Sequence, residues 1–396
     1  MSKISDRLNR LSYSQTFVMS NKVREMKASG VDVISLTLGE PDFDVPQKIK
    51  QAAFDAINEN YSHYSPVPGF LELRQAVADK LKRDNNLDYK PTQICVSNGA
   101  KQSIINVLAA IVNDGDEVIL PAPYWVSYDE MVKLVGGTSV FIETSIDTDF
   151  KITAAQLEQA ITPKTKALLY SSPCNPSGSF YTGEELEAIA NVIAKYPDIT
   201  IISDEIYEFI NYDGEHVSIA SFPQVYEQTA VINGMSKAFA MTGWRIGYSA
   251  CPDWLAKACD KVQGQMTSGA NTVAQRASIT ALKMDPQELQ YMISEFHKRR
   301  DLVYGLMKEI KGFKCNLPKS AFYIFPDISY YLGKTLNGTE IKDADDFAMF
   351  LLENAHVGCV GGVSFGSPEC IRFSYAASEE ELTEAMTRIK NFLDQF

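Results

Sequence analysis

Lys237 lies in a segment whose residue types suit imine formation with an aldehyde. It follows the short apolar run Val231–Ile232, and Ser236 comes directly before it. A lysine amine becomes a good nucleophile when burial or a nearby cation lowers its pKa. Arg245 follows eight residues later and could bind an anion. An amine next to an anion-binding arginine suits a phosphorylated aldehyde, whereas a surface charge is the usual role of a single lysine.

Asp204 is a candidate partner for that amine. It ends the apolar run Ile199–Ser203, and ligands of open α/β sheets bind at the carboxyl ends of the strands. A carboxylate there could keep a pyridine nitrogen protonated, so that the ring withdraws electrons from a substrate. A helix N-cap is the alternative interpretation of Asp204. Tyr207 could contact a ring hydroxyl or belong to the core.

The turn at Gly99, Ala100 and Lys101 suits phosphate binding. It joins the apolar run Ile94–Ser97 to a stretch with helical periodicity. The free N–H groups at a helix N-terminus attract anions. An ordinary strand-to-helix turn is the alternative.

Three further side chains could bind a flat ring or a carboxylate. Asn175 lies in a proline-rich turn and could hydrogen-bond to a ring oxygen. Trp125 could stack on a ring. Arg372 lies in the alternating run Ile371–Tyr375 and could bind a carboxylate through both ends of its guanidinium. Plain turn formation, core packing and a solvated strand face are the respective alternatives.

Strand-like and helix-like segments alternate through the middle of the chain, which predicts an α/β fold with a largely parallel sheet covered by helices. The expected strands are Ile94–Ser97, Glu117–Leu120, Lys166–Ser171, Ile199–Ser203, Val231–Ile232 and Arg245–Ala250, and the expected helices include Pro46–Asn58, capped by Asp44. Asp285 and Pro286 begin a long helix of about 25 residues. We therefore expect a large domain over 44–285 and a smaller α+β domain from 1–43 plus 286–396.

Composition excludes several classes of function. The 396 residues carry 37 Lys and Arg against 50 Asp and Glu, so the formal net charge is −13. This charge argues against nonspecific binding to nucleic acids or anionic membranes. The seven cysteines form no CxxC motif and the four histidines show no zinc spacing, which indicates free thiols and no metal site. No signal peptide or membrane span is evident, so we expect a cytoplasmic protein.

Together these motifs resemble the fold-type I, class I pyridoxal-phosphate aminotransferases. The matching segments are 38–43 (Leu-Gly-Glu-Pro-Asp-Phe), Asn175 with its Pro-x-Gly, 203–207 (Ser-Asp-Glu-x-Tyr), 236–247 and Arg372. Segments 99–102, 124–128 and 240–244 resemble the bacterial aspartate aminotransferases of the Iβ branch in particular. The resemblance runs from about residue 14 to the end and implies a seven-stranded, mostly parallel sheet in the large domain.

The resemblance implies a role for each matching residue. Lys237 would hold the cofactor, pyridoxal 5'-phosphate, as an internal aldimine. The cofactor would also contact Gly99, Ala100, Lys101, Trp125, Asn175, Asp204, Tyr207, Ser236, Arg245 and, from the neighbouring subunit, Tyr64. The substrate would contact Gly39, Arg372, Trp125, Asn175, Lys101 and Thr16, with Gly39 and Arg372 at its α-carboxylate. Three departures are Cys174, Ala100 and Gly234, of which Gly234 lacks a hydroxyl that some branches direct to the phosphate.

The implied activity is ping-pong transamination between L-aspartate and 2-oxoglutarate, giving oxaloacetate and L-glutamate, in a homodimer with shared active sites. Two separate cations, Arg372 and Lys101, favour a substrate with two carboxylates. A prephenate or aromatic amino-acid aminotransferase of the same branch is the alternative. A regulatory ligand-binding domain is disfavoured because residues 1–21 are too few for a DNA-binding region. A dehydrogenase is disfavoured because no GxGxxG follows a strand.

Overall fold

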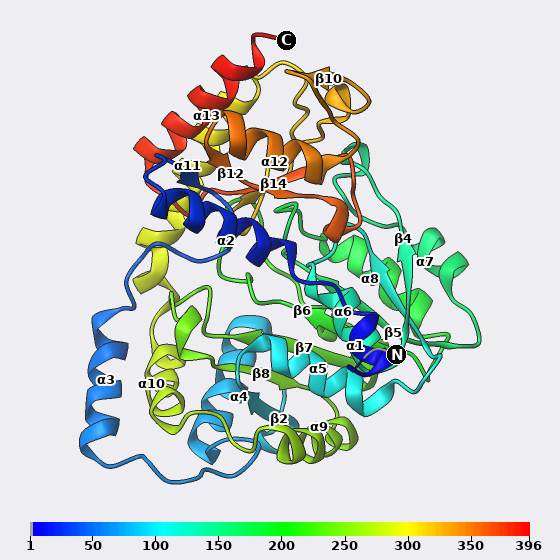
Figure 1. Cartoon of the computed structure of the whole chain (residues 1–396). Coiled ribbons are helices and arrows are strands. Elements are labelled where there is room, and N and C mark those ends of the chain that lie inside the picture. The colour runs from blue at the N-terminus through cyan, green and yellow to red at the C-terminus, as the bar shows by residue number, and fades with distance from the viewer. Residues whose placement is uncertain (1–2) are drawn as a thin grey trace.

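The predicted seven-stranded sheet forms the centre of the larger half of the molecule (Figure 1). The computed structural model describes residues 3–396. In spatial order the strands are β2 (Ile94–Ser97), β8 (Gly247–Ala250), β7 (Thr229–Gly234), β6 (Thr200–Asp204), β5 (Thr165–Ser171), β3 (Glu117–Pro121) and β4 (Thr138–Ile142). β8 runs antiparallel to β2 and β7, and the other pairs are parallel. The α/β fold class is therefore confirmed.

Helices cover both faces of this sheet, which is why its central strands are continuous apolar runs in the sequence. In β5, Leu168 and Leu169 are both buried but belong to clusters on opposite faces. One face packs against α5 (Ala100–Ile111), α6 (Ser127–Leu134) and α9 (Asp253–Met266). The other packs against α4 (Leu71–Asn85), α7 (Ala154–Ala160), α8 (Gly183–Ile193) and α10 (Thr272–Lys283), and α3 (Gln47–Asn58) packs on α10.

A second unit is built mainly from the C-terminal part of the chain. Its antiparallel sheet has the order β13 (Val360–Gly361), β14 (Ile371–Ser374) and β9 (Tyr323–Ile324). Its helices are α11 (Gln290–Met307), α12 (Ala344–Asn354) and α13 (Glu379–Leu393), with a small hairpin of β10 (Thr335–Leu336) and β11 (Thr339–Glu340). The segment 34–35, β1 (Ile34–Ser35), pairs with β12 (Val357–Gly358).

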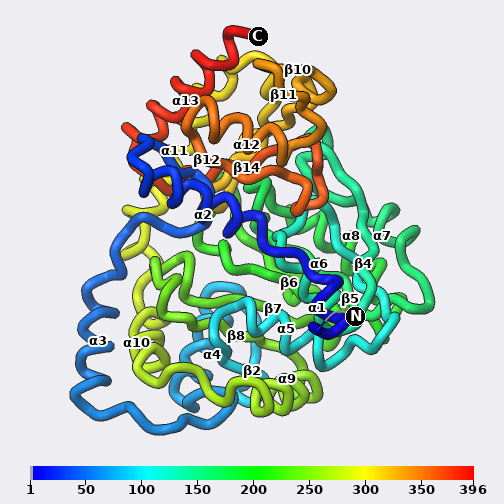
Figure 2. Tube along the Cα trace, in the orientation of Figure 1, coloured from blue at the N-terminus to red at the C-terminus, as the bar shows by residue number. Residues whose placement is uncertain are grey.

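The N-terminal segment runs from this second unit to the larger half (Figure 2). Helix α2 (Gln15–Ala28) buries Met19 and Val23 in the C-terminal core cluster. Helix α1 (Asp6–Asn9) contacts α6 instead, and the Ser12 N–H donates to the Glu130 carboxylate at 2.8 Å. The chain between these helices therefore passes over the boundary between the two halves. The domain limits at residues 44 and 285 stay a prediction.

Three local expectations need correction. Asp44 does not cap α3, because its carboxylate binds Lys50 at 2.8 Å and Pro46 occupies the N-cap. The helix expected to continue from Asp285 is divided into a short 3₁₀ helix, Pro286–Leu289, and α11. Strand β4 was not predicted, because it lies at the sheet edge and is partly exposed, so its sequence is not uniformly apolar. Among residues 3–396 no helix is long and apolar enough to cross a membrane.

Candidate active site

A cavity of about 300 Å³ opens between the two halves, at the carboxyl ends of the central strands. Its lining includes most of the predicted site residues: Thr16, Gly39, Ala100, Lys101, Trp125, Asn175, Asp204, Tyr207, Ser236, Lys237, Arg245 and Arg372. Gly99 lies just behind this lining, in contact with Arg245. Tyr64 lies elsewhere, with its side chain 97% exposed. The topology therefore brings together residues spread over more than 350 positions of the chain.

The amine of Lys237 lies inside this cavity after the end of β7. Its Nζ donates a hydrogen bond to the Gly39 carbonyl at 2.5 Å. Burial lowers the pKa of Lys237 to about 8, and the positive charges of Arg372 and Arg245 act in the same direction. Glu40 and Asp204 oppose this shift. About a tenth of the amine is therefore uncharged at pH 7, far more than for a solvated lysine, and the uncharged form is the one that a nucleophile or proton carrier requires.

The carboxylate of Asp204 faces the same cavity from the end of β6. One oxygen accepts a hydrogen bond from the Tyr128 hydroxyl at 2.7 Å, and the other accepts from the Ile206 N–H at 3.3 Å. Burial raises the pKa of Asp204 to about 6, against the lowering effect of these two bonds. A turn at residues 206–209 follows, so the helix N-cap interpretation is wrong. Asp204 can accept a proton more readily than a solvated carboxylate can.

Tyr207 and Tyr323 form one side of the cavity. Their hydroxyls are hydrogen-bonded at 2.7 Å, and the Tyr323 hydroxyl also lies where a Cβ on residue 39 would be, at 1.9 Å from that position. Residue 39 must therefore be glycine for Tyr323 to keep this place. Tyr207 thus lines the site as predicted, through a partner that the sequence did not indicate.

Arg372 is a buried cation that lacks an acidic partner among the described residues. Its side chain is 1% exposed and lies between the rings of Tyr323 and Phe365. Its Nη1 donates to the Asn175 side-chain oxygen at 2.9 Å and its Nη2 to the Thr37 carbonyl at 2.6 Å, while its buried Nε has no hydrogen-bond partner. Burial lowers its pKa. Because burying an uncompensated charge is costly, this guanidinium fits a carboxylate ligand.

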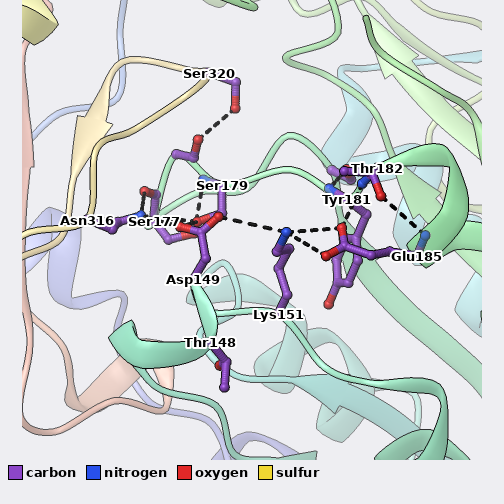
Figure 3. Close-up of polar contacts among 12 residues, drawn as sticks. Thr148, Asp149, Lys151, Ser177, Ser179, Tyr181, Thr182, Glu185, Asn316 and Ser320 are labelled. Atoms are coloured by element: carbon purple, nitrogen blue, oxygen red, sulfur yellow. Dashed lines mark hydrogen bonds and ion pairs between the residues drawn. The ribbon is translucent and has the colours of Figure 1, made fainter. Parts of the chain in front are cut away.

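The turn that carries Asn175 is held in place from behind by polar contacts with the second unit (Figure 3). The Asn316 side-chain amide donates to Asp149 at 3.0 Å and to the Ser179 hydroxyl at 3.2 Å. The Ser320 hydroxyl donates to the Gly178 carbonyl at 2.9 Å. These bonds fix the turn against a segment more than 130 residues away, so the position of Asn175 depends on both halves of the molecule.

An anion-binding cradle lies at the other end of the cavity, where α5 begins. The first N–H groups of a helix have no acceptor within the helix. A Cβ on Gly99 would lie 2.3 Å from Arg245 Nη2, and a Cβ on Gly247 would lie 2.1 Å from the Ala100 nitrogen. Both glycines therefore let Arg245 and the helix start approach closely. Lys101 adds a third source of positive potential, with its Nζ 4.8 Å from the Trp125 ring centre.

Eleven lining residues were not predicted as site residues from the sequence: Ser14, Phe17, Leu38, Glu40, Val126, Ser127, Tyr128, Ser171, Ile206, Thr242 and Tyr323. Tyr128 carries a usable signal, because it stands three residues after Trp125, and the two rings are in edge-to-face contact with their centres 5.6 Å apart. Tyr323 carries none, since it comes from the second unit. Among the described residues, the cavity lining holds one carboxylate besides Asp204, that of Glu40, which accepts a hydrogen bond from the Thr242 hydroxyl.

Comparison with known proteins identifies the family. Residues 31–389 match the family model described as aminotransferase class I and II. The chain belongs to this family. It is 47% identical to a probable aspartate/prephenate aminotransferase of Rhizobium leguminosarum bv. phaseoli and 44% identical to the aspartate aminotransferase of Bacillus subtilis, each over 99% of both chains. The aspartate aminotransferase structure from Rhizobium meliloti matches with a TM-score of 0.96 and 40% identity, covering 100% of this chain and 99% of that one.

Members of this family use pyridoxal phosphate, and the cavity of this aminotransferase fits that cofactor. Lys237 would offer its amine to the aldehyde, and Asp204 would offer its carboxyl group to the ring nitrogen, since both line the cavity. The cradle at Gly99 and Arg245 offers donors and positive charge to a phosphate. A Thermus thermophilus aspartate aminotransferase structure with maleate has a TM-score of 0.93 and 39% identity, covering 99% of this chain and 100% of that one.

The pKa of Lys237 leads to a prediction for cofactor uptake. Because the amine is protonated below about pH 8, its nucleophilic fraction should rise about tenfold per pH unit up to that value and then level off. Stopped-flow absorbance of the cofactor-free protein mixed with pyridoxal phosphate should show this profile. The Lys237→Ala protein should show no such absorbance change, because it lacks the amine that reacts with the aldehyde. A rate that keeps rising toward pH 10 would contradict the lowered pKa.

Proposed function

We propose that this aminotransferase transfers the amino group of L-aspartate to 2-oxoglutarate, giving oxaloacetate and L-glutamate. The observation that carries the proposal is Arg372, a buried guanidinium at the cavity wall that has no acidic partner among residues 3–396. It suits the α-carboxylate that every amino-acid and oxo-acid substrate shares. Relatives named aspartate aminotransferase or aspartate/prephenate aminotransferase support the choice of aspartate.

Lys237 would act as the proton carrier of the reaction. When bound, the cofactor supplies an electron-withdrawing ring that accepts the electron pair of the substrate Cα–H bond. Lys237 would take the Cα proton and return it to the cofactor's aldehyde carbon, for which its amine must be uncharged. Its lowered pKa supports this role, because the free amine is available near neutral pH.

Asp204, Tyr207, Asn175 and Trp125 would orient and polarise the ring. Asp204 would hold a proton at the ring nitrogen, and the Tyr128 hydroxyl would keep its carboxylate in place. Tyr207 and Asn175 would donate to the ring's phenolic oxygen. The Trp125 ring would stack on one face of the cofactor. The N–H groups around Gly99, Ala100 and Lys101 would bind the phosphate, with Ser236 and Arg245.

Lys101 and Thr16 would bind the distal carboxylate, and Gly39 would join Arg372 at the α-carboxylate. Lys101 and Arg372 line the same cavity from different halves of the molecule. Burial lowers the pKa of Lys101, followed by the charge of Arg245, so an anionic ligand would relieve both effects. A ligand with two carboxylates can therefore engage both cations at once.

Prephenate is the second candidate substrate, with aromatic amino acids as a variant of it. Phe17, Leu38 and Trp125 line the cavity and offer apolar surface to a ring. Several relatives are named aspartate/prephenate aminotransferases, and a Petunia hybrida relative, 44% identical over 98% of this chain and 82% of its own length, is named as bifunctional. Prephenate also carries a second carboxylate that would suit Lys101.

An amino-acid panel with 2-oxoglutarate tests the function directly. We expect aspartate to exceed alanine and tyrosine in kcat/KM by about a hundredfold, because unpaired cationic groups in a site discriminate strongly against ligands that lack the matching anion. Oxo-acid formation measures the panel, and prephenate is tested in the reverse role with aspartate as donor. Equal turnover of alanine would contradict aspartate specificity, and preferred turnover of prephenate would favour the second candidate.

Lys101→Ala tests the distal contact. We expect kcat/KM for aspartate to fall about 30-fold, the effect of losing one charge-assisted hydrogen bond, with alanine little affected. Lys133→Ala, which removes a lysine outside the cavity lining, is the matched control. Equal losses for aspartate and alanine would show that Lys101 acts on the cofactor alone.

We also propose a cytoplasmic homodimer in which Tyr64 completes the partner's site. Tyr64 is 97% exposed and lies outside its own cavity, and Phe54, Ile57 and Leu71, which flank it in the sequence, also expose apolar surface. Tyr64→Phe should weaken pyridoxal phosphate binding about tenfold, because a hydrogen bond to a charged phosphate is lost. Tyr291→Phe is an exposed control.

Light scattering tests the homodimer separately. It should give twice the chain mass of 44.0 kDa, and a monomeric holoenzyme would refute the proposal.

A further inference from the structure

A cluster of charged side chains lies buried behind the segment that carries Asp204 and Tyr207. It consists of Lys80 on α4 with Glu205, Glu208 and His216, and we refer to these four residues as the buried charge cluster. Lys80 and Glu205 are each 1% exposed. None of the four lines the active-site cavity. Burial of four ionisable groups is costly unless each is paired, so their arrangement requires an explanation.

Every carboxylate oxygen of the cluster has a protein partner. One Glu205 oxygen accepts from the hydroxyls of Ser203 at 3.0 Å and Ser218 at 2.7 Å, and the other lies 3.0 Å from His216 Nε2. Glu208 is ion-paired with Lys80 and accepts from the Asn85 amide at 2.9 Å. Each carboxylate oxygen of both glutamates therefore has at least one partner within the protein.

These contacts rule against a metal site. Glu205, Glu208 and His216 have ligand atoms within 4.8 Å of one another, a spacing that a metal ion could use. The Lys80 ammonium, however, already occupies the position next to Glu208 and lies 4.9 Å from the Phe209 ring centre. A cation would have to displace both Lys80 and the hydrogen bonds of Glu205. The cluster is better described as a closed network.

The network is joined directly to the active site through the backbone. Asp204 faces the cavity, whereas its neighbours Ser203 and Glu205 turn to the cluster. The Glu205 N–H donates to the Ile232 carbonyl of β7 at 2.8 Å, so Glu205 is held in line with the sheet. Tyr207 likewise lines the cavity while Glu208 turns away. The cluster therefore holds both cofactor-facing residues from behind.

We propose that Glu205 is a positioning residue for the reaction, whose buried negative charge and hydrogen bonds keep Asp204 in place as the partner of the cofactor's ring nitrogen. The inference rests on the proposed function of Asp204. A negative charge behind Asp204 raises the affinity of the Asp204–ring nitrogen pair for the proton that the two groups share. Consistent with this, the pKa of Asp204 is raised mainly by burial and to a lesser degree by the charge of Glu205.

The surrounding charges set how strongly Glu205 acts. His216 lies 3.0 Å from Glu205, and although burial opposes it, this contact raises the pKa of His216. A protonated His216 would offset part of the Glu205 charge. Lys80 is committed to Glu208. Lys237 acts on Asp204 from the cavity side, and Tyr128 hydrogen-bonds to it. Removing Glu205 therefore removes the acidic charge closest in sequence to Asp204 without touching the cavity lining.

Nitrogen nuclear magnetic resonance of the holoenzyme tests the proposal. The protein is loaded with pyridoxal phosphate labelled with nitrogen-15 in the ring, and the ring resonance is followed as the pH is raised. In Glu205→Gln we expect the midpoint of nitrogen deprotonation to fall by about one pH unit, a tenfold loss of proton affinity. His216→Gln removes the offsetting positive charge at a less buried position and should move the midpoint upward.

Glu208→Gln is the matched control, because it removes an equal charge from the same cluster on the side paired with Lys80. We expect it to lower the thermal unfolding temperature while leaving the nitrogen resonance in place. A merely structural role for Glu205 would likewise lower stability alone. Unchanged nitrogen midpoints in both Glu205→Gln and His216→Gln would overturn the inference. If the wild-type protein took up no cofactor, the proposed function itself would fail instead.

Discussion

The removal of water from a small group of ionisable side chains is the constraint on which this active site depends. Burial makes the charged forms of Lys237, Asp204 and Arg372 less favourable, and each pKa shifts in the direction that burial dictates. The result is an amine that is partly free, a carboxylate that readily accepts a proton, and a guanidinium that needs an anion. These are three of the properties that transamination requires of its protein.

Such a site is costly, and the fold compensates by close backbone packing around it. Gly39 leaves room for the Tyr323 hydroxyl, and Gly99 and Gly247 let Arg245 approach the start of α5. Without these glycines, the cavity walls could not come close enough to exclude water while leaving donors exposed to a ligand. Close pairing continues behind the site, where Glu205 accepts hydrogen bonds from Ser203 and Ser218 next to the segment that carries Asp204.

The two halves of the molecule contribute different parts of the chemistry. The large sheet presents Lys237, Asp204 and the cradle of donors at the start of α5 at the carboxyl ends of its strands. The second unit contributes Arg372 and Tyr323, and it holds the Asn175 turn through Asn316. A ligand bound between them would contact both units. Substrate binding and the relative position of the two halves are therefore physically coupled.

The sequence alone determined the fold class, the family and about half of the cavity lining, because apolar runs indicate buried strands and the motifs near Asn175, Asp204 and Lys237 are local in the chain. It could not place Tyr323, which contacts Tyr207 across 116 residues of chain. It also could not place Glu205, whose side chain turns away from the cavity. Only the tertiary structure showed that Arg372 lacks an acidic partner among the described residues, since burial and ion pairing depend on packing between distant segments rather than on residues adjacent in the sequence.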